Sequence, residues 1–437
     1  MINKESLNYI INFLIGLPTD NYDRYVMYGS QPDGTPGTVF VLSSGFFDED
    51  IYGTEKSMPE FPLAAIDGVP LLFGEPLIEK NDRQVIIHGD IVASTYFLIT
   101  RYEEMIQPDV RDKYGRFPGI ESLPSRAGFI RRPIVEEYGV ILRQCMREVG
   151  VNIPEPVKGF SNIYLTHDVD IPWEHFTLYS AIRRILGETF KRHNFTLYPL
   201  KNILGFPKDD PRYTFDELIN ADRSVPEARS IYFVKSTGYL QPEDCVPYIR
   251  KKETKKLIRL LKESDAELGY HVSFEAGKHP QKITEELKVL RDVLSENTVM
   301  SRNHYLASLE PRDFYYLLDN GITDDFTMGY ADQAGFRLGT CRVVRWIDPE
   351  NGRLTNLRLH PLDIMDGTLY AKQYMNLDEE ASYGLTEQII QNVYTYGGDL
   401  CLLWHNNETV GKDSLNWRNY KNSLDLIKTI RENNSTK

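Results

Sequence analysis

From residue 161 onward the chain alternates short apolar segments with longer helical ones, and this alternation limits the fold more than any other feature. Amphipathic segments such as 243–265 and 281–297 separate the apolar runs, and Leu287, Leu290 and Leu294 share one face of the second. The segments predicted as strands are 162–168, 230–236, 268–274, 298–304, 321–325, 357–361 and 400–406. Strands and helices in this alternation favour right-handed βαβ units, and hence a parallel sheet or barrel.

Several of these predicted strands end in side chains that can take part in chemistry. The first ends in "THDVD" at 166–170, and later ones end in His271, in "RNH" at 302–304, in two aspartates at 324–325 and in His405. In parallel α/β barrels the carboxyl ends of the strands and the loops after them build the active site. We therefore expect these side chains to converge.

Asp168 and Asp170 are two positions apart at the end of the first predicted strand. A strand projects alternate side chains to the same face, so the two carboxylates would point the same way and repel each other. A bound cation, or a proton held on one carboxylate, would compensate the repulsion. The alternative is a loop with two solvated acids, which is common in a chain with 63 acidic residues.

Asp170 and His271 are the clearest candidate metal ligands. Carboxylate oxygen and imidazole nitrogen both bind divalent transition metals, and zinc sites with an open position commonly use three protein ligands. Glu275 would be the third ligand if residues 271–275 turn into a helix, because positions four apart share a helix face. His304 is the competing candidate for the third ligand.

A metal at these residues predicts a hydrolytic site. Asp168 would lie beside the metal as a general base for a water molecule whose pKa the metal lowers. Arg302 would keep Asp168 ionised and oriented. His405 could act as the general acid toward a leaving amine or alcohol, so the set describes hydrolysis of an amide or an ester.

The composition limits the domain count and the partners. The chain has 437 residues, which is long for one hydrophobic core, so two domains are expected. A net charge of −13 argues against nucleic acid or an anionic membrane surface as the main partner. The four cysteines form no CxxC pair, so we expect reduced and mostly buried thiols.

The first twenty residues predict an amphipathic helix and not a signal peptide. Leu7, Ile10 and Leu14 recur at helical spacing, and Gly16 and Pro18 end the pattern. No segment approaches the ~20 apolar residues that a membrane-spanning helix needs. We therefore expect no integral membrane segment and a cytoplasmic protein.

Residues 1–155 predict a smaller mixed α/β domain of unknown role. Short apolar runs at 38–44, 69–73 and 84–90 alternate with Gly- and Pro-rich turns and are followed by two helical segments. The Pro-punctuated stretch "NIPEPVKG" at 152–159 suits a junction. The second domain is accordingly predicted to span residues 156–437.

The motifs together resemble those of the polysaccharide deacetylase superfamily, the family-four carbohydrate esterases. "THDVD", "GYHVSFEAG", "SRNHY", "TDDFTMGYADQAGFRLGT" and "LLWHN" occur in that order over residues 161–410. Upstream, "GDIVASTYFLITRYEE" and "RRPIVEEYG" are similar to an uncharacterised N-terminal domain found in a bacterial branch of that superfamily. The resemblance implies a distorted (β/α)7 barrel and metal-dependent removal of N- or O-acetyl groups from sugars.

The resemblance also assigns roles to the metal ligands and the base. Asp168 matches the base of the family, Asp170 matches a metal ligand, and His271 matches the first His of the second motif. Glu275 stands where the family has another His, and this departure leaves the metal identity and the activity open. His304 replaces a Pro of the family and stays a candidate ligand.

The remaining matches concern catalysis and substrate binding. Arg302 would orient the base, and the backbone N–H of Tyr305 would stabilise an oxyanion. His405 matches the general acid, with Asp324 or Asp325 as its carboxylate partner. The aromatic residues expected to bind substrate are Trp173, Tyr330, which stands near the position of a Trp of the family, and Trp404.

An insertion at about 172–213 follows the first strand and is predicted to form a lid or wall beside the site. It combines aromatic with basic residues, which could stack on sugar rings and meet an anionic or phosphate-linked glycan. The alternative is a helical hairpin whose aromatic side chains pack into the fold. The residues concerned are Trp173, Phe176, Tyr179, Tyr198, Arg183, Arg184, Lys191 and Arg192.

The sequence thus favours a deacetylase that acts on a sugar or polysaccharide intermediate. The expected cofactor is a divalent metal, with zinc ahead of cobalt and nickel, and the expected partner is a carbohydrate. Two alternatives remain open at this point. One is a catalytically inactive relative that binds carbohydrate, and the other is a different metallohydrolase such as a cyclic amidase.

Overall fold

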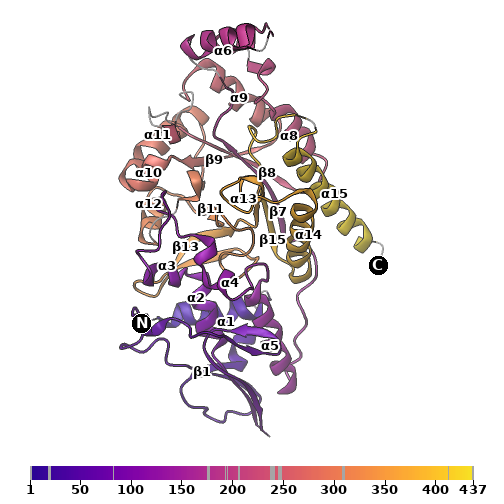
Figure 1. Cartoon of the computed structure of the whole chain (residues 1–437). Helices are drawn as coiled ribbons and strands as arrows, with labels where there is room; N and C mark the ends of the chain where they lie inside the picture. The colour runs from indigo at the N-terminus through magenta and orange to yellow at the C-terminus, as the bar shows by residue number, and fades with distance from the viewer. Residues whose placement is uncertain are drawn as a thin grey trace.

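The fold consists of a large parallel sheet with helices around it and a smaller sheet formed by the N-terminal residues (Figure 1). The computed structural model describes residues 2–17, 21–81, 83–174, 178–191, 193, 195–204, 207–236, 242–244, 249–307, 311–411 and 413–435. The strands are β1 Val26–Gly29, β2 Thr38–Leu42, β3 Ala64–Ile66, β4 Val69–Leu71, β5 Gly74–Lys80, β6 Gln84–Gly89, β7 Asn162–Val169, β8 Arg229–Val234, β9 Glu267–Val272, β10 Met300–Asn303, β11 Asp324–Met328, β12 Val344–Asp348, β13 Arg353–Pro361, β14 Ile364–Met365 and β15 Asp399–Leu403.

The α-helices fall between and after these strands. They are α1 Lys4–Ile15, α2 Ile91–Ile99, α3 Tyr102–Ile106, α4 Leu123–Arg126, α5 Ile134–Glu148, α6 Leu178–Lys191, α7 Tyr198–Ile203, α8 Phe215–Asp222, α9 Lys252–Glu263, α10 Phe274–Lys278, α11 Ile283–Leu294, α12 Phe314–Asp319, α13 Asp366–Tyr370, α14 Glu379–Tyr396 and α15 Leu415–Ser435. Two short 3-10 helices near the candidate site are η5 Pro242–Asp244 and η7 His304–Leu306.

The large sheet has nine strands in the order β12-β13-β11-β10-β9-β8-β7-β15-β14. Its neighbouring strands are parallel except for the antiparallel pair β12 and β13. The sheet curls, because β13 and β15 contact each other although five strands separate them in the sheet order. Residues 362 and 363 join β13 to β14, so the chain itself crosses the gap between the two sides.

Strand β7 is buried on both faces, and the side chains on its two faces pack into two different apolar clusters. Ile163 and Leu165 face the apolar cluster under α14 and α15. Tyr164 faces the inside of the curl, where it packs with Phe233 and Cys401 of other strands. Because side chains alternate along a strand, residues 166, 168 and 170 continue on the inner face toward the carboxyl end. The candidate site therefore lies above this inner apolar cluster.

The N-terminal elements form a four-stranded sheet in the order β1-β2-β6-β5, which lies at the lower end of the molecule in Figure 1. Its core is continuous with that of the large sheet, since Leu14 and Tyr96 belong to the same buried cluster as Trp346 and Leu359. The predicted boundary near residue 155 stays a prediction.

The structure places a strand on each of the seven segments predicted as strands, with the ends shifted by a few residues. Helix α1 ends at Gly16, which adopts a left-handed conformation with φ of 70°, as the sequence predicts. Strands β12 and β14 were not predicted, and because the large sheet has nine strands the count of seven βα units is not confirmed. The three cysteines in the described part, Cys145, Cys341 and Cys401, are free and buried.

The insertion contributes α6 and α7, and α6 forms the far end of the molecule from the N-terminal sheet (Figure 1). Phe176 and Arg192, two of the residues considered for a lid, lie outside the described residues. In the described part of the chain, we find no helix with the length and apolar character required to span a bilayer.

Candidate metal centre

Strand β7 brings Asp168 and Asp170 to one place at its carboxyl end. Asp168 is buried within the strand, and Asp170 follows one residue beyond it. Nε2 of His271, from β9, lies 3.7 Å from Asp168 Oδ2 and 3.0 Å from Asp170 Oδ1. Since one imidazole contacts both carboxylates, the two side chains point to the same side, as the spacing predicts.

Asp170, His271 and His304 form the one group in the described residues whose side-chain atoms could together hold a metal ion, with one ligand atom from each within 4.8 Å of the others. Nε2 of His304 lies 3.3 Å from Asp170 Oδ1. These residues come from the ends of three strands, β7, β9 and β10. The curl of the sheet brings the strand ends together.

The hydrogen bonds of the two histidines fix which ring nitrogen faces the group. Nδ1 of His271 lies 2.9 Å from the carbonyl oxygen of Arg302, and Nδ1 of His304 lies 3.1 Å from a carboxylate oxygen of Asp244. Both partners accept, so each Nδ1 carries the proton and donates. Each Nε2 faces Asp170 Oδ1, at 3.0 Å in His271 and 3.3 Å in His304. Carbonyl or carboxylate support of Nδ1 is typical of histidines whose Nε2 binds a metal. The donor set fits a divalent cation.

Lys235, one residue beyond β8, is a member of the site that the sequence interpretation missed. Its ammonium lies 3.3 Å from Asp170 Oδ1 and 3.1 Å from His304 Nε2, and its side chain is 2% exposed. The ammonium thus contacts two of the three candidate ligands. The segment 230–236 was predicted as a strand that ends here, so the strand-end rule could have found Lys235.

Arg302, from β10, forms an ion pair with Asp168. Its Nη1 donates to Asp168 Oδ1 at 3.0 Å and to the hydroxyl of Thr166 at 2.8 Å, and the side chain is completely buried. Burial alone would raise the pKa of the Asp168 carboxyl, but the charges of His271, Arg302 and His405 outweigh burial and lower the pKa.

The pKa of Asp170 is also low. Burial acts to raise it, whereas the positive charges of His304 and Lys235 and the hydrogen bonds from the two histidines hold it well below its usual range. Both carboxylates are therefore ionised at neutral pH. Two carboxylates this close repel each other, and the positive groups around them offset that repulsion, as the spacing of Asp168 and Asp170 in the sequence predicts.

His405, two residues beyond β15, lies on the other side of the two aspartates. Its Nε2 is 3.6 Å from Asp170 Oδ2 and 3.9 Å from Asp168 Oδ2. Its Nδ1 donates to Asp366 Oδ1 at 2.7 Å, and its backbone N–H donates to Asp366 Oδ2 at 2.8 Å. Burial alone would lower the pKa of His405, but the carboxylates of Asp366, Asp170 and Asp168 outweigh burial and raise it to about 10.

The carboxylate partner of His405 corrects the sequence interpretation, which offered Asp324 or Asp325. Asp324 instead binds Arg358 and His360, and Asp325 accepts hydrogen bonds from Ser301 and Thr327. Asp366 follows the two-residue strand β14. A strand this short has no periodic pattern that could have identified Asp366 from the sequence.

Glu275 lies apart from the candidate ligands. A helix, α10, begins only at Phe274, and His271 lies in strand β9, so positions 271 and 275 do not share a helix face as that alternative required. The carboxylate of Glu275 instead binds Lys282 at 2.5 Å. The structure therefore gathers His304, and not Glu275, with Asp170 and His271.

The three aromatic residues predicted to bind substrate lie in the interior. Trp173 is 1% exposed and belongs to the largest apolar core, and Trp404 is 0% exposed and donates its indole N–H to the carbonyl of Asn416. Tyr330 is 6% exposed and packs with Phe117 and Ile130. None of the three rings presents a free face to a sugar, so this part of the prediction needs correction.

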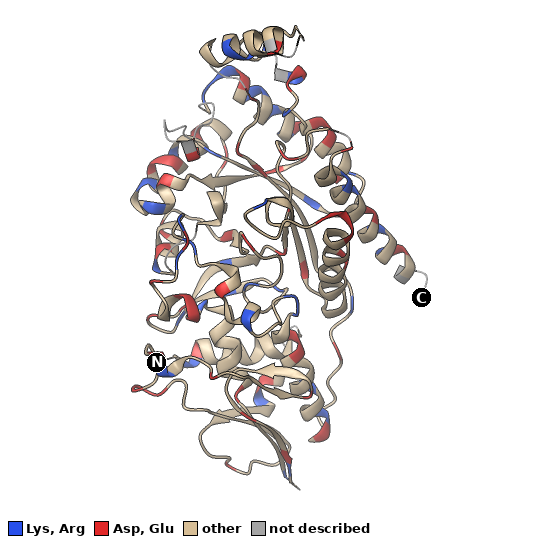
Figure 2. Ribbon diagram, viewed as in Figure 1, with Lys and Arg blue, Asp and Glu red and all other residues tan. Residues whose placement is uncertain are grey.

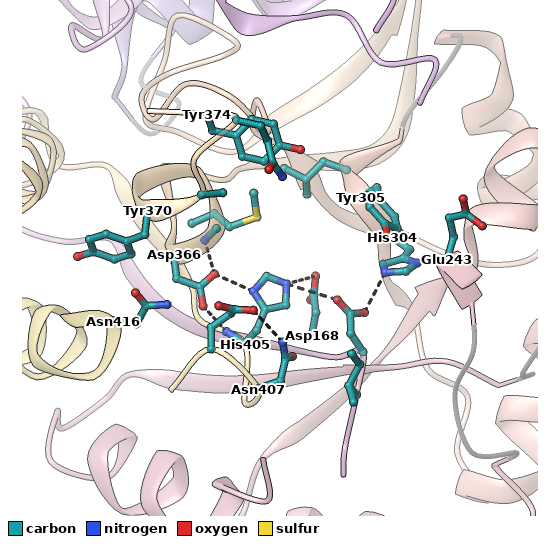
Figure 3. A pocket seen from close by; sticks show the side chains of 18 of the residues that line it. Asp168, Glu243, His304, Tyr305, Asp366, Tyr370, Tyr374, His405, Asn407 and Asn416 are labelled. Carbon is teal, nitrogen blue, oxygen red and sulfur yellow. Dashed lines mark hydrogen bonds and ion pairs between the residues drawn. The ribbon is translucent and has the colours of Figure 1, made fainter. Parts of the chain in front are cut away.

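A cavity of about 460 Å³ opens over the candidate ligands. Figure 3 shows His405 between Asp366 and Asp168 in this cavity, with Tyr370 and Tyr374 on one side. Tyr305 also lines it, and the described lining residues include none from the insertion at 172–213. The predicted lid therefore has no described contact with the cavity.

The N-terminal part contributes to the wall of the cavity through Arg116. This side chain is 8% exposed, pairs with Asp112, and donates to the carbonyl of Tyr305 at 2.9 Å and to the hydroxyl of Tyr374 at 3.0 Å. The ring of Tyr305 stacks on that of Tyr114 with the ring centroids 4.9 Å apart. Tyr305 has a φ of 60°, a left-handed conformation that is strained for a residue with a side chain and that concentrates at functional sites.

Comparisons with known sequences and structures assign no function to this chain. Residues 2–150 match the model of a group described as "Family of unknown function (DUF7033)". This match covers less than half of the chain and carries no activity with it. No curated protein matches the chain in sequence.

The solved structures that the comparison returns include a protein of Mycobacterium smegmatis described as a polysaccharide deacetylase. It has 12% sequence identity and a TM-score of 0.36 and covers 62% of this chain and 87% of its own. Two mutants of a CE4-family pseudoenzyme, one with restored enzymatic activity, have 10% and 9% identity, TM-scores of 0.28, and cover 65% of this chain and 70% and 69% of theirs. At these TM-scores the likenesses carry no argument about fold or function.

Proposed function

We propose that this protein is a metal-dependent hydrolase that removes N- or O-acetyl groups from a sugar or polysaccharide intermediate. The observation that carries the proposal is the convergence of Asp170 Oδ1 with the Nε2 atoms of His271 and His304, beside a cavity that Asp170 and His304 line. A carboxylate base, Asp168, and a protonated histidine, His405, lie next to this group. The acetyl specificity rests on the resemblance of the sequence motifs to those of polysaccharide deacetylases.

Asp170, His271 and His304 would hold the cation, with zinc expected from the one-carboxylate, two-imidazole donor set. A divalent cation at this point would polarise a carbonyl oxygen and favour deprotonation of water. The Nδ1 hydrogen bonds of both histidines would keep their rings oriented for this role.

Asp168 is suited to accept the proton of the attacking water. Its Oδ1 is held by Arg302, which leaves Oδ2 directed toward His271 and His405. The lowered pKa keeps this carboxylate ionised at neutral pH. The buried guanidinium fixes its orientation, so that little reorganisation is needed when the proton arrives.

His405 is suited to donate a proton to the leaving amine or alcohol. With a pKa raised to about 10 it is protonated at neutral pH, and Asp366 occupies its Nδ1–H. The proton on Nε2 is therefore the one available to the substrate. Asp168 and His405 have opposed protonation states beside the candidate ligands, which is the division of roles that hydrolysis requires.

The cavity suits a carbohydrate. Tyr305, Tyr370 and Tyr374 supply aromatic surface, and the side chains of Asn407 and Asn416 supply hydrogen-bonding groups. Rings of this kind stack on the apolar faces of sugars, while amide groups bind hydroxyl groups. A cytoplasmic sugar intermediate remains our proposal for the substrate.

The first test is the metal content of the purified full-length protein after incubation with zinc, cobalt or nickel and removal of free metal. We expect about one ion per chain, lost in the Asp170→Ala, His271→Ala and His304→Ala variants. Glu275→Ala is the matched control and should keep the ion. Loss of the ion in Glu275→Ala but not in His304→Ala would reverse the choice of third ligand.

A second measurement tests hydrolysis in the metal-loaded protein. Acetate release from acetylated sugars should fall by about 100-fold or more in Asp168→Asn and His405→Gln, as is typical for the loss of a general base or acid. Both variants should still bind the ion. Unchanged acetate release in both would reject the proposed roles.

Lys235 favours a second candidate function, a carbohydrate-binding protein without metal or catalysis. Its ammonium already supplies a positive charge to Asp170 and His304. On this alternative the wild type would take up none of the three metals and would still bind sugars. The metal analysis therefore separates the two candidates.

A further inference from the structure

Helix α6 exposes an apolar stripe to solvent. Its sequence is amphipathic, and at 100° per residue five apolar side chains fall within about a third of the helix circumference. Their exposed fractions are 58% for Leu178, 76% for Tyr179, 46% for Ile182, 51% for Leu186 and 74% for Phe190. An amphipathic helix on a globular fold normally turns this face toward the core.

The orientation of α6 is fixed by its opposite side. Ala181 and Glu188 are buried, and Glu188 forms an ion pair with Arg184 at 3.1 Å. The helix thus turns a small residue and a charged pair toward the fold and leaves five of its large apolar side chains exposed. Two further apolar side chains shortly after the helix are also exposed, Phe195 by 67% and Leu197 by 47%.

The sequence of this segment has a net charge of the opposite sign to that of the whole chain. Residues 178–195 contain four basic residues and one acidic residue, whereas the net charge of the protein is −13. Figure 2 shows basic residues on α6 at the far end of the molecule. At physiological salt charges act over about 8 Å, so a partner at α6 meets the local positive charge and not the distant acidic surface.

We propose that α6 docks on the surface of a lipid bilayer that contains anionic lipids. Leu178, Ile182 and Phe190 would enter the boundary between headgroups and acyl chains, while Arg183, which is exposed at the edge of the stripe, would contact the headgroups. An exposed apolar stripe flanked by basic residues is the pattern of helices that lie in the membrane interface.

A second copy of the chain fits this surface less well. Arg183 and Arg184 lie at the middle of α6, so a two-fold axis through the middle of the stripe would bring the two copies of Arg183 together. Like charges at the centre of an apolar contact oppose association. Anionic headgroups would instead neutralise the same side chains.

The test is co-sedimentation of the full-length protein with vesicles. Phosphatidylcholine vesicles with and without about 30% phosphatidylglycerol would be compared at low and high salt. We expect binding to the anionic vesicles that weakens with salt, and a loss of about tenfold or more in the Ile182→Glu/Phe190→Glu variant. Arg183→Ala should weaken binding roughly fivefold through the lost headgroup contact.

The matched control is Ile120→Glu/Val157→Glu, which changes two side chains that are 57% and 87% exposed elsewhere on the surface. It should bind vesicles as the wild type does, and circular dichroism should be alike for all variants. Failure of the wild type to bind anionic vesicles would overturn the proposal. So would unchanged binding of Ile182→Glu/Phe190→Glu, or a dimer in sedimentation velocity that this variant abolishes while vesicles stay unbound.

Discussion

The pairing of His405 with Asp366 decides the protonation state of the candidate acid. Asp366 accepts from both Nδ1 and the backbone N–H of His405, at 2.7 and 2.8 Å, and is 0% exposed. A buried carboxylate in this place favours the imidazolium form through charge and hydrogen bonding together. The same residue thereby holds the ring with Nε2 toward Asp168 and Asp170.

Asp366→Asn should therefore lower the pKa of His405 from about 10 by at least about one pH unit. Asp168 and Asp170 remain, so part of the elevation should persist. The measurement is an NMR titration of the histidine ring in protein stripped of metal. Asp378→Asn, at the exposed cap of α14, should leave the titration unchanged. A pKa of about 10 in both variants would contradict the role of Asp366.

At the scale of elements, helix contacts place the N-terminal part against the rest of the fold. Helices α1 and α5 cross so closely that a Cβ atom on Gly139 of α5 would lie 2.3 Å from the carbonyl oxygen of Leu14 in α1. A backbone atom cannot move aside as a flexible side chain does. Gly139 is thus required by the close approach of the two helices.

Gly139→Ala should destabilise the protein by about 1–3 kcal/mol, because the methyl group forces the helices apart. Gly384→Ala is the matched control, since Gly384 lies inside α14 and nothing beyond its chain neighbours and the adjacent backbone of its own helix lies within 4 Å of an added Cβ. There alanine should stabilise by roughly 0.5–1 kcal/mol through its better helix propensity. Urea unfolding measures both, and equal effects of the same sign would refute the close-approach explanation.

At the scale of the whole molecule, a buried ionic cluster joins the two parts of the chain. Glu104 of α3 pairs with Arg101 and with Arg337, which lies between β11 and β12, and Nη2 of Arg337 is 2.7 Å from Glu104 Oε2. Burial alone would raise the pKa of Glu104, but the two guanidinium groups outweigh burial and lower it to about 2. This carboxylate therefore contributes stability above about pH 4.5, and the contribution is lost as the pH falls toward 2.

Glu104→Gln should cost on the order of 3 kcal/mol at pH 7, because two buried arginines lose their carboxylate. Because the two parts share a core, the loss of unfolding free energy should be the same by tryptophan fluorescence and by far-UV circular dichroism. The fluorescence reports only on Trp173, Trp346, Trp404 and Trp417. Glu137→Gln, which removes a partly exposed pair with Arg132, should cost under about 1 kcal/mol. Two separate unfolding transitions would contradict a common core.

Much of the fold could be read from local pattern. The seven strand segments and helix α1 follow from apolar runs and periodicity, which depend only on neighbouring residues. Strands β12 and β14 were not predicted. β12 is an antiparallel strand at the edge of the sheet and β14 has only two residues, so neither shows a clear apolar run or periodicity. The predicted lid has no described contact with the cavity, because helix amphipathicity does not say which way the apolar face turns.

Some features of the candidate site also follow from local sequence pattern, and others do not. The sequence alone determined that Asp168 and Asp170 share a face and that His271 and His405 stand at strand ends, because side-chain direction along a strand is local. Only the tertiary structure decided that His304 rather than Glu275 joins the ligands, that Asp366 pairs with His405, and that Lys235 reaches Asp170. These choices depend on how far the sheet curls and on which strand ends it brings together, and packing between segments distant in sequence sets both.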